Sequence, residues 1–160
     1  MANNNSPALK IEYIPVDKLE QYKKNTRKHG NEDVAEIAKS IEKYGFDDPI
    51  GIWSDHNIIV EGHGRLMAAK KLGMTEVPCI RLDHLTDQER REYAIMHNKT
   101  AELSEWDMDM LSDELADLDL SDFNVKFDGK GRGDADGKGR SDRRGHPARA
   151  VRGGTDVESR

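Results

Sequence analysis

One junction constrains the fold more than any other stretch of the chain. Residues 58–73 read IIVEGHGRLMAAKKLG, in which an apolar β-branched run is followed by a polar turn and then by a helix-like run that ends at Gly73. The glycines Gly62 and Gly64 let the backbone bend and let a ligand approach closely. A helix that begins here directs unpaired N–H groups and the positive end of its dipole at the turn, where they favour an anion. The sequence therefore predicts a strand, a turn and a helix with the outline of a phosphate site.

Three side chains of this turn suit the same chemistry. Arg65 offers a guanidinium that grips two phosphate oxygens at once. His63, with an ordinary pKa of about 6.5, suits hydrogen bonding to a phosphate or general acid–base catalysis. Glu61 offers a carboxylate for Mg²⁺ or for proton transfer. The alternative is a purely structural turn, in which case Arg65→Ala lowers the stability of the free protein and no nucleotide binds.

Composition narrows the class of protein. The chain has 160 residues, of which 35% are hydrophobic and 35% are charged, so we expect one domain with a modest core and extensions. The one cysteine, Cys79, excludes an internal disulfide framework and a multi-cysteine zinc site in this chain, and it fits a reducing compartment. Because no apolar run approaches the ~20 residues that span a bilayer, we expect a cytoplasmic protein that does not contact membranes.

Local patterns predict four strands and four helices. Alternation and β-branched runs place strands at 9–15, 49–53, 57–61 and 76–82, with SDHN joining the second and third as a hairpin. An apolar stripe from Val34 predicts a helix that is capped by Asn31 and ended by Gly45, and RLMAAKKL predicts a second helix after the turn. Capping-box motifs at Thr86 and Ser104 start a helix at 87–99 and a last amphipathic helix. The last helix carries Trp106, Met110, Leu111, Leu115 and Leu118.

Charge is distributed unevenly along the chain, whose net charge is −6. Residues 101–122 hold nine carboxylates and no Lys or Arg, whereas residues 128–160 have a net charge of +3 and eight of the fourteen glycines. We therefore predict a flexible N-terminus at 1–8, a domain at 9–100, an acidic helical extension at 101–127 and a disordered Gly/Arg-rich tail at 128–160. The tail is either a linker or a nucleic-acid-binding segment. Because the remainder is acidic, any contact with DNA must be local, and the basic loop at 23–29 is the candidate.

The motifs IPVDKL, NTRKH, IAKSIEKYGFDDPIGIW, IIVEGHGRLMAAKKLG and VPCIRL resemble, in order and spacing, the N-terminal domain of the ParB/sulfiredoxin superfamily. The resemblance covers residues 9–82. The following AIMHNKTAELSEWDMDMLSDEL is similar to the continuation in phage and mobile-element ParB-like proteins, including those found with DNA methyltransferases. The resemblance implies an α/β fold with a small mixed sheet, surrounding helices and a C-terminal helical extension.

The resemblance also implies a nucleotide site. In segregation ParB proteins the turn is Gly-Glu-Arg-Arg and binds the triphosphate of CTP; Gly62 matches its glycine and Arg65 its second arginine. Arg27 matches the arginine of an upstream basic motif, and Asn98 falls near a later motif whose asparagine helps to hold phosphate and metal. The implied ligand is CTP or ATP with Mg²⁺. His63 and Gly64 stand where the family motif has a glutamate and an arginine. With the residue chemistry added, our candidate phosphate ligands are Gly62, His63, Gly64, Arg65, Arg27, Lys28 and Asn98, with Glu61 as the candidate metal ligand and Glu61 and His63 as catalytic candidates.

Differences between this chain and the family's motifs reject one activity and leave three kinds of function open. Sulfiredoxins have a nucleophilic cysteine where this chain has His63, so that activity is rejected. We predict no helix-turn-helix after Leu82, since the last helix is too acidic to read DNA. The leading hypothesis is a nucleotide-binding, DNA-associated protein of phage or mobile-element type. The alternatives are a Mg-dependent nuclease or small-molecule kinase or NTPase, and a non-catalytic adaptor to a DNA methyltransferase or another phage protein whose acidic helix binds a basic partner.

Overall fold

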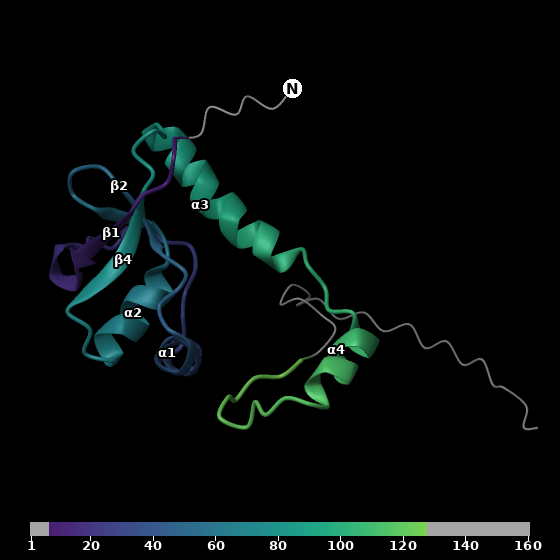
Figure 1. Ribbon diagram of the computed structural model, residues 1–160. Helices are drawn as coiled ribbons and strands as arrows, with labels where there is room; N and C mark the ends of the chain where they lie inside the picture. Colours follow the sequence, from purple (N-terminus) through teal and green to yellow (C-terminus); the bar gives the residue numbers. More distant parts are fainter. Residues whose placement is uncertain (1–6, 128–160) are drawn as a thin grey trace, which may run out of the picture.

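The computed structural model describes residues 7–127, in which the strands form one four-stranded mixed sheet (Figure 1). The strands lie in the order β1 (Ile11–Pro15), β4 (Glu76–Arg81), β2 (Ile50–Trp53) and β3 (Ile58–Glu61), and a short 3-10 turn, η1 (Val16–Lys18), follows β1. β1 pairs antiparallel with β4 and β2 pairs antiparallel with β3, whereas β2 and β4 are parallel. The predicted α/β class, the hairpin and the small mixed sheet are confirmed.

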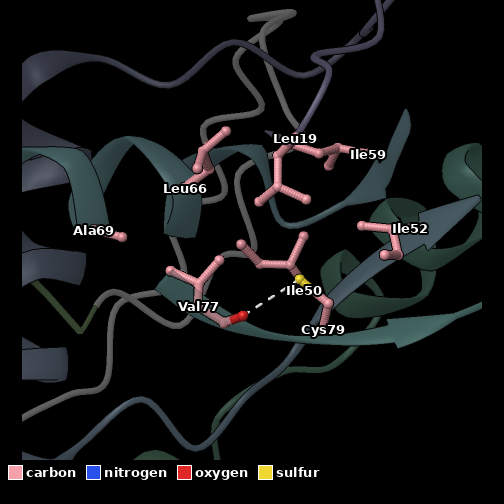
Figure 2. Packing of buried hydrophobic residues seen from close by; sticks show 8 residues of the cluster. All are labelled: Leu19, Ile50, Ile52, Ile59, Leu66, Ala69, Val77 and Cys79. Atoms are coloured by element: carbon pink, nitrogen blue, oxygen red, sulfur yellow. Dashed lines mark hydrogen bonds between the residues drawn. The ribbon is translucent and has the colours of Figure 1, made fainter. Parts of the chain in front are cut away.

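Helix α2 (His63–Lys71) lies between the sheet and α1 (Asn31–Tyr44). One face of α2 packs on the strands and makes the main core (Figure 2). Its buried members are Leu19, Ile50, Ile52, Ile59, Leu66, Ala69, Val77 and Cys79. On its other side, Ala68 contacts Val34 and Ala38 of α1. Because α2 is buried on two sides, the start of this helix is held firmly against the end of β3.

The helices form where the local signals place them, but their ends differ by up to three residues: α2 begins at His63 rather than Arg65, and the helix predicted at 87–99 continues to Glu102. Thr86 and Glu89 form the predicted capping box of α3 (Asp87–Glu102), through Glu89 N to Thr86 Oγ1 at 3.2 Å and Thr86 N to Glu89 Oε2 at 2.7 Å. Gly45 ends α1 with φ 98°, as predicted. The N-cap of α1 is Gly30 rather than Asn31, which is the first helical residue. α3 then crosses beside β3 and brings its second half toward the polar turn.

The acidic extension differs from its prediction. α4 (Met108–Leu115) begins four residues after Ser104, and its cap is Asp107, whose Oδ1 accepts from Met110 N at 3.1 Å. The capping box at Ser104 is therefore wrong, because an Asp one turn later supplies the N-cap and Asp109 adds charge to the first turn. Trp106 and Leu118 lie outside the helix.

Beyond α4 the chain returns to α1. Asp122 forms an ion pair with Lys43 at 3.0 Å, and Asn124 N donates to Glu36 Oε2 at 3.0 Å. The predicted tail at 128–160 and most of the predicted flexible N-terminus lie outside the described residues. Within residues 7–127, no helix combines the length and apolar character needed to cross a bilayer.

Cys79→Ser should destabilise the protein, because the Cys79 side chain is fully buried in the apolar core and its Sγ donates to Val77 O at 3.6 Å (Figure 2). The serine hydroxyl would leave water for the apolar core when the chain folds. We therefore expect the free energy of unfolding to fall by about 1–3 kcal/mol. Urea denaturation measures this loss. Cys79→Ala is the matched control, since it removes the sulfur without adding a polar group; an equal loss in both variants would assign the effect to packing alone.

Candidate functional site

The polar turn has the predicted geometry. β3 ends at Glu61, Gly62 adopts a left-handed conformation with φ 101°, and α2 begins at His63. A Cβ on Gly62 would lie 3.0 Å from the nearest guanidinium nitrogen of Arg65, so both the conformation and the space require glycine. The first N–H groups of α2 have no carbonyl one turn earlier and are directed out of the helix end. A helix N-terminus therefore lies beside a guanidinium, and anion binding at this turn stays a prediction.

A buried carboxylate holds this turn together. Glu61 is 7% exposed, its Oε1 accepts from Gly51 N at 3.0 Å, and its Oε2 pairs with Arg65 Nη2. Arg65 Nη1 donates to the backbone oxygen of Asp48 at 2.9 Å and also pairs with the Asp48 carboxylate. Burial raises the pKa of Glu61, and the neighbouring charge of Arg65 opposes that rise. Arg65 is thus part of the framework of the turn as well as a candidate ligand residue.

A cavity of about 470 Å³ lies beside the turn, and most of the predicted site residues line it. Arg27 reaches it from the loop before α1 and Asn98 from α3, where Arg27 Nη1 donates to Asn98 Oδ1 at 3.1 Å although the two residues are 71 positions apart. A second hydrogen bond, from Asn98 Nδ2 to Ala94 O at 3.0 Å, orients the amide. Six predicted residues line this cavity: Arg27, Glu61, Gly62, Gly64, Arg65 and Asn98.

His63 and Lys28 do not line this cavity. The His63 ring lies on the other side of the turn, where its Nε2 accepts from Tyr22 N at 3.3 Å and where it borders a second cavity of about 200 Å³. Burial, and secondarily the proximity of His29, lower the pKa of His63, which favours the neutral ring. The catalytic and phosphate-binding roles of His63 stay predictions that this placement does not support.

Gly64 lines the cavity and also allows close packing. A Cβ there would lie 3.0 Å from both the His29 ring and Ile37 Cδ1, so on that side the glycine lets the loop before α1 and α1 itself pack against the first turn of α2. The contact of Gly64 with a phosphate stays a prediction.

Sequence reasoning missed several polar residues of the cavity, of which Asp48 and His97 contact the predicted site. Asp48 precedes Pro49 at the start of β2, and the pairing of Gly51 with Glu61 brings that end of β2 to the turn. His97 lies in α3, where its Nε2 is 3.6 Å from Glu61 Oε2. Its position directly before Asn98 was the available signal, since neighbours on a helix can border one site.

The described residues do not form a magnesium site of their own. Within residues 7–127, no cluster of three or more His, Cys, Asp or Glu side chains could hold a metal ion. Both oxygens of Glu61 already accept hydrogen bonds, from Gly51 and Arg65. Mg²⁺ prefers one or two carboxylates plus phosphate oxygens, so metal would have to arrive with its phosphates. Glu61 as a metal ligand therefore stays a prediction, and no step of the function proposed below depends on it.

Comparison with known proteins gives a consistent result. The sequence profile of the ParB N-terminal domain matches residues 1–99. The ParB-like nuclease domain-containing protein YnaK of Escherichia coli K12 is 42% identical over 86 residues, which are 54% of this chain and 98% of YnaK. The probable plasmid-partitioning protein ParB of Deinococcus radiodurans is 37% identical over 88 residues, 53% of this chain and 30% of that protein. The match to the partitioning protein thus covers less than a third of its length.

The fold also matches a solved structure. The C-terminally truncated chromosome-partitioning protein ParB from Caulobacter crescentus, complexed with CTP-γ-S, superposes with a TM-score of 0.55 at 24% identity. The match covers 67% of this chain and 60% of that one. At this identity the likeness establishes a fold shared with that ParB structure and nothing more.

Arg65→Ala should destabilise the free protein by about 3 kcal/mol, because it leaves the buried Glu61 carboxylate without its partner. Adding Glu61→Gln should recover part of the loss, since the amide oxygen still accepts from Gly51 N and carries no charge. Chemical denaturation of the two single variants and the double variant measures the coupling. If Arg65→Ala left the stability unchanged, the guanidinium would serve only a ligand.

Acidification should destabilise the protein through His63. Its folded-state pKa lies below the usual 6.5, so the unfolded chain takes up the proton at a higher pH than the folded one. The contribution of neutral His63 to the free energy of unfolding is therefore complete above about pH 6.5. It is lost as the pH falls below that value toward the pKa of His63 in the folded state. We expect His63→Gln to lose less melting temperature than the wild type between about pH 7.5 and 5.5. An equal loss would assign the pH dependence to other groups, such as His29, whose pKa is also lowered by burial.

Proposed function

The chain belongs to the ParB N-terminal domain family, and on this premise we propose that it is a nucleotide-binding, DNA-associated protein that holds CTP or ATP in the cavity at the start of α2. One observation carries the proposal. Arg27 and Asn98, which are remote in the sequence, meet at the cavity that the helix N-terminus and Arg65 also line. Convergence of two cationic side chains and an amide at a helix N-terminus is what a chain of phosphates requires.

The cavity has a second wall that suits the nucleoside. Ile37 and Ile41 of α1 line it together with Phe46, so part of its lining is apolar. A ligand that is polar at one end and flat and apolar at the other matches such a cavity. We assign the phosphates to the start of α2, with Arg65 and Arg27, and the base and sugar to the side of α1. The Caulobacter ParB, which shares the fold, was solved with a CTP analogue, and this supports the choice of ligand class.

The association with DNA is assigned to the basic loop at 23–29, because the rest of the domain and its extension are acidic. Similarity to a plasmid-partitioning protein supports this part of the proposal. A cytoplasmic location, a phage or mobile-element origin, the absence of a helix-turn-helix and a DNA methyltransferase partner stay predictions from the sequence.

The enzymatic alternatives have less support from the geometry. The two catalytic candidates from the sequence are poorly placed for a nuclease or a kinase, because Glu61 is buried with both oxygens hydrogen-bonded and His63 does not line the cavity. A thiol mechanism has no reactive group near the turn, since burial raises the pKa of Cys79 to about 11 in the core. The adaptor alternative concerns α4 and is compatible with nucleotide binding in the domain.

A nucleoside triphosphate should raise the melting temperature of the protein, because a ligand that binds only the folded state stabilises it by about 2.7 kcal/mol at 100 times Kd. Thermal-shift assays and calorimetric titration with CTP, ATP and GTP, each with and without Mg²⁺, measure binding. Arg27→Ala should weaken binding at least about tenfold, as expected for the loss of a charge-assisted phosphate contact. Arg65→Lys should retain part of the affinity, since an ammonium keeps the charge but loses the fork.

Lys23→Ala is the matched control for Arg27→Ala, because it removes the same charge from the same loop at a residue that does not line the cavity. Its affinity should stay close to that of the wild type. Absence of any thermal shift or heat with all three nucleotides would refute the proposal.

A further inference from the structure

Two carboxylates of unequal character hold Arg65. The Glu61 side chain is 7% exposed and also accepts from Gly51 N, so it is fixed in the interior. The Asp48 side chain is 77% exposed, and its carboxylate pairs with the other terminal nitrogen of the same guanidinium, Nη1. One partner is therefore structural and the other is a surface group that is free to move into water.

Asp48 can release Arg65 at little cost. Exposed ion pairs are weak because water and salt replace the partner. The backbone oxygen of Asp48 accepts from Arg65 Nη1 at 2.9 Å in addition to the carboxylate, so the guanidinium keeps its orientation when the side chain turns away. Glu61 cannot do the same, because its departure would bury an unpaired charge and open its bond to Gly51 N.

The charges around the cavity make this release necessary for an anion. Arg27 and Arg65 line it together with three carboxylates, those of Asp47, Asp48 and Glu61. Arg65 is already neutralised by its own partners, so a phosphate gains little from it until one partner leaves. Of the two, only Asp48 is exposed and lacks a second buried bond.

We propose that Asp48 is a specificity-determining residue of this cavity: its carboxylate competes with the ligand's phosphate for Arg65 Nη1 and sets how strongly anions bind. This inference rests on the proposed function and deepens it. Ligands with phosphates displace the Asp48 side chain, whereas neutral ligands leave it in place. Removing the Asp48 charge strengthens the binding of anions and leaves the binding of an uncharged nucleoside as it was.

Calorimetric titration of the wild type, Asp48→Asn and Asp47→Asn with CTP, inorganic triphosphate and cytidine tests the proposal. Asp47→Asn is the matched control, because it removes the same charge from the neighbouring residue, which also lines the cavity and for which the structure describes no contact with Arg65. At low ionic strength, we expect Asp48→Asn to bind CTP and triphosphate roughly three- to tenfold more tightly than the wild type does. The affinity of Asp47→Asn for the same ligands should differ from that of the wild type by less than about twofold. Melting of the unliganded Asp48→Asn protein should stay near the wild-type value.

The possible results separate the two proposals. Suppose that CTP binds the wild type. If the affinity for CTP then rises no more in Asp48→Asn than in Asp47→Asn, or if the affinity for cytidine rises as much as that for CTP, the competition by Asp48 is refuted and nucleotide binding stands. If triphosphate binds Asp48→Asn more tightly than it binds the wild type, and CTP binds no more tightly than triphosphate does, the competition stands and the nucleotide assignment falls. If neither anion binds any variant, both are refuted.

Discussion

The buried carboxylate of Glu61 is the contact on which the rest of the site depends. It lies at the end of β3, accepts from Gly51 N of β2 and pairs with Arg65 of α2, so it joins the hairpin to the helix. A Cβ on Gly51 would lie 2.9 Å from Glu61 Oε1, and this close approach coincides with a shift in the β2–β3 register. An unpaired charge at this depth is costly, so Arg65 must stay near Glu61 whatever else it binds.

Because of this constraint, Arg65 can be a structural residue and a ligand-binding residue at the same time. The guanidinium has five donors, and its two terminal nitrogens are held by different carboxylates. The Glu61 side orients the group, while the Asp48 side faces the cavity and solvent. Around this fixed centre, the loop that carries Arg27 and the helix that carries Asn98 close the cavity through one exposed hydrogen bond. The site thus combines a buried ion pair with walls that come from α1, from α3 and from the loop before α1.

The elements that were predicted well depend on local chemistry. The capping box at Thr86, the left-handed glycines that end α1 and start α2, and the hairpin all involve residues within a few positions of one another. The prediction at Ser104 failed because two capping signals overlap, and Asp107 supplied the cap. For the site, the motifs identified Arg27, Gly62, Arg65 and Asn98, and the structure brings all four to one cavity. Their roles as ligands remain to be measured by the experiments above.

By itself, the sequence determined the succession of strands and helices, the sharp turn before α2 and the polar residue types gathered there, because these follow from backbone propensities and short-range hydrogen bonds. Only the tertiary structure decided which way each side chain of the turn faces. His63 turns toward Tyr22, Gly64 gives its space to His29 and Ile37, and Asp48 reaches Arg65 across the hairpin. Those outcomes depend on burial and on partners far away in the chain, and the free energy of pairing a buried charge cannot be assigned until the partner's position is known.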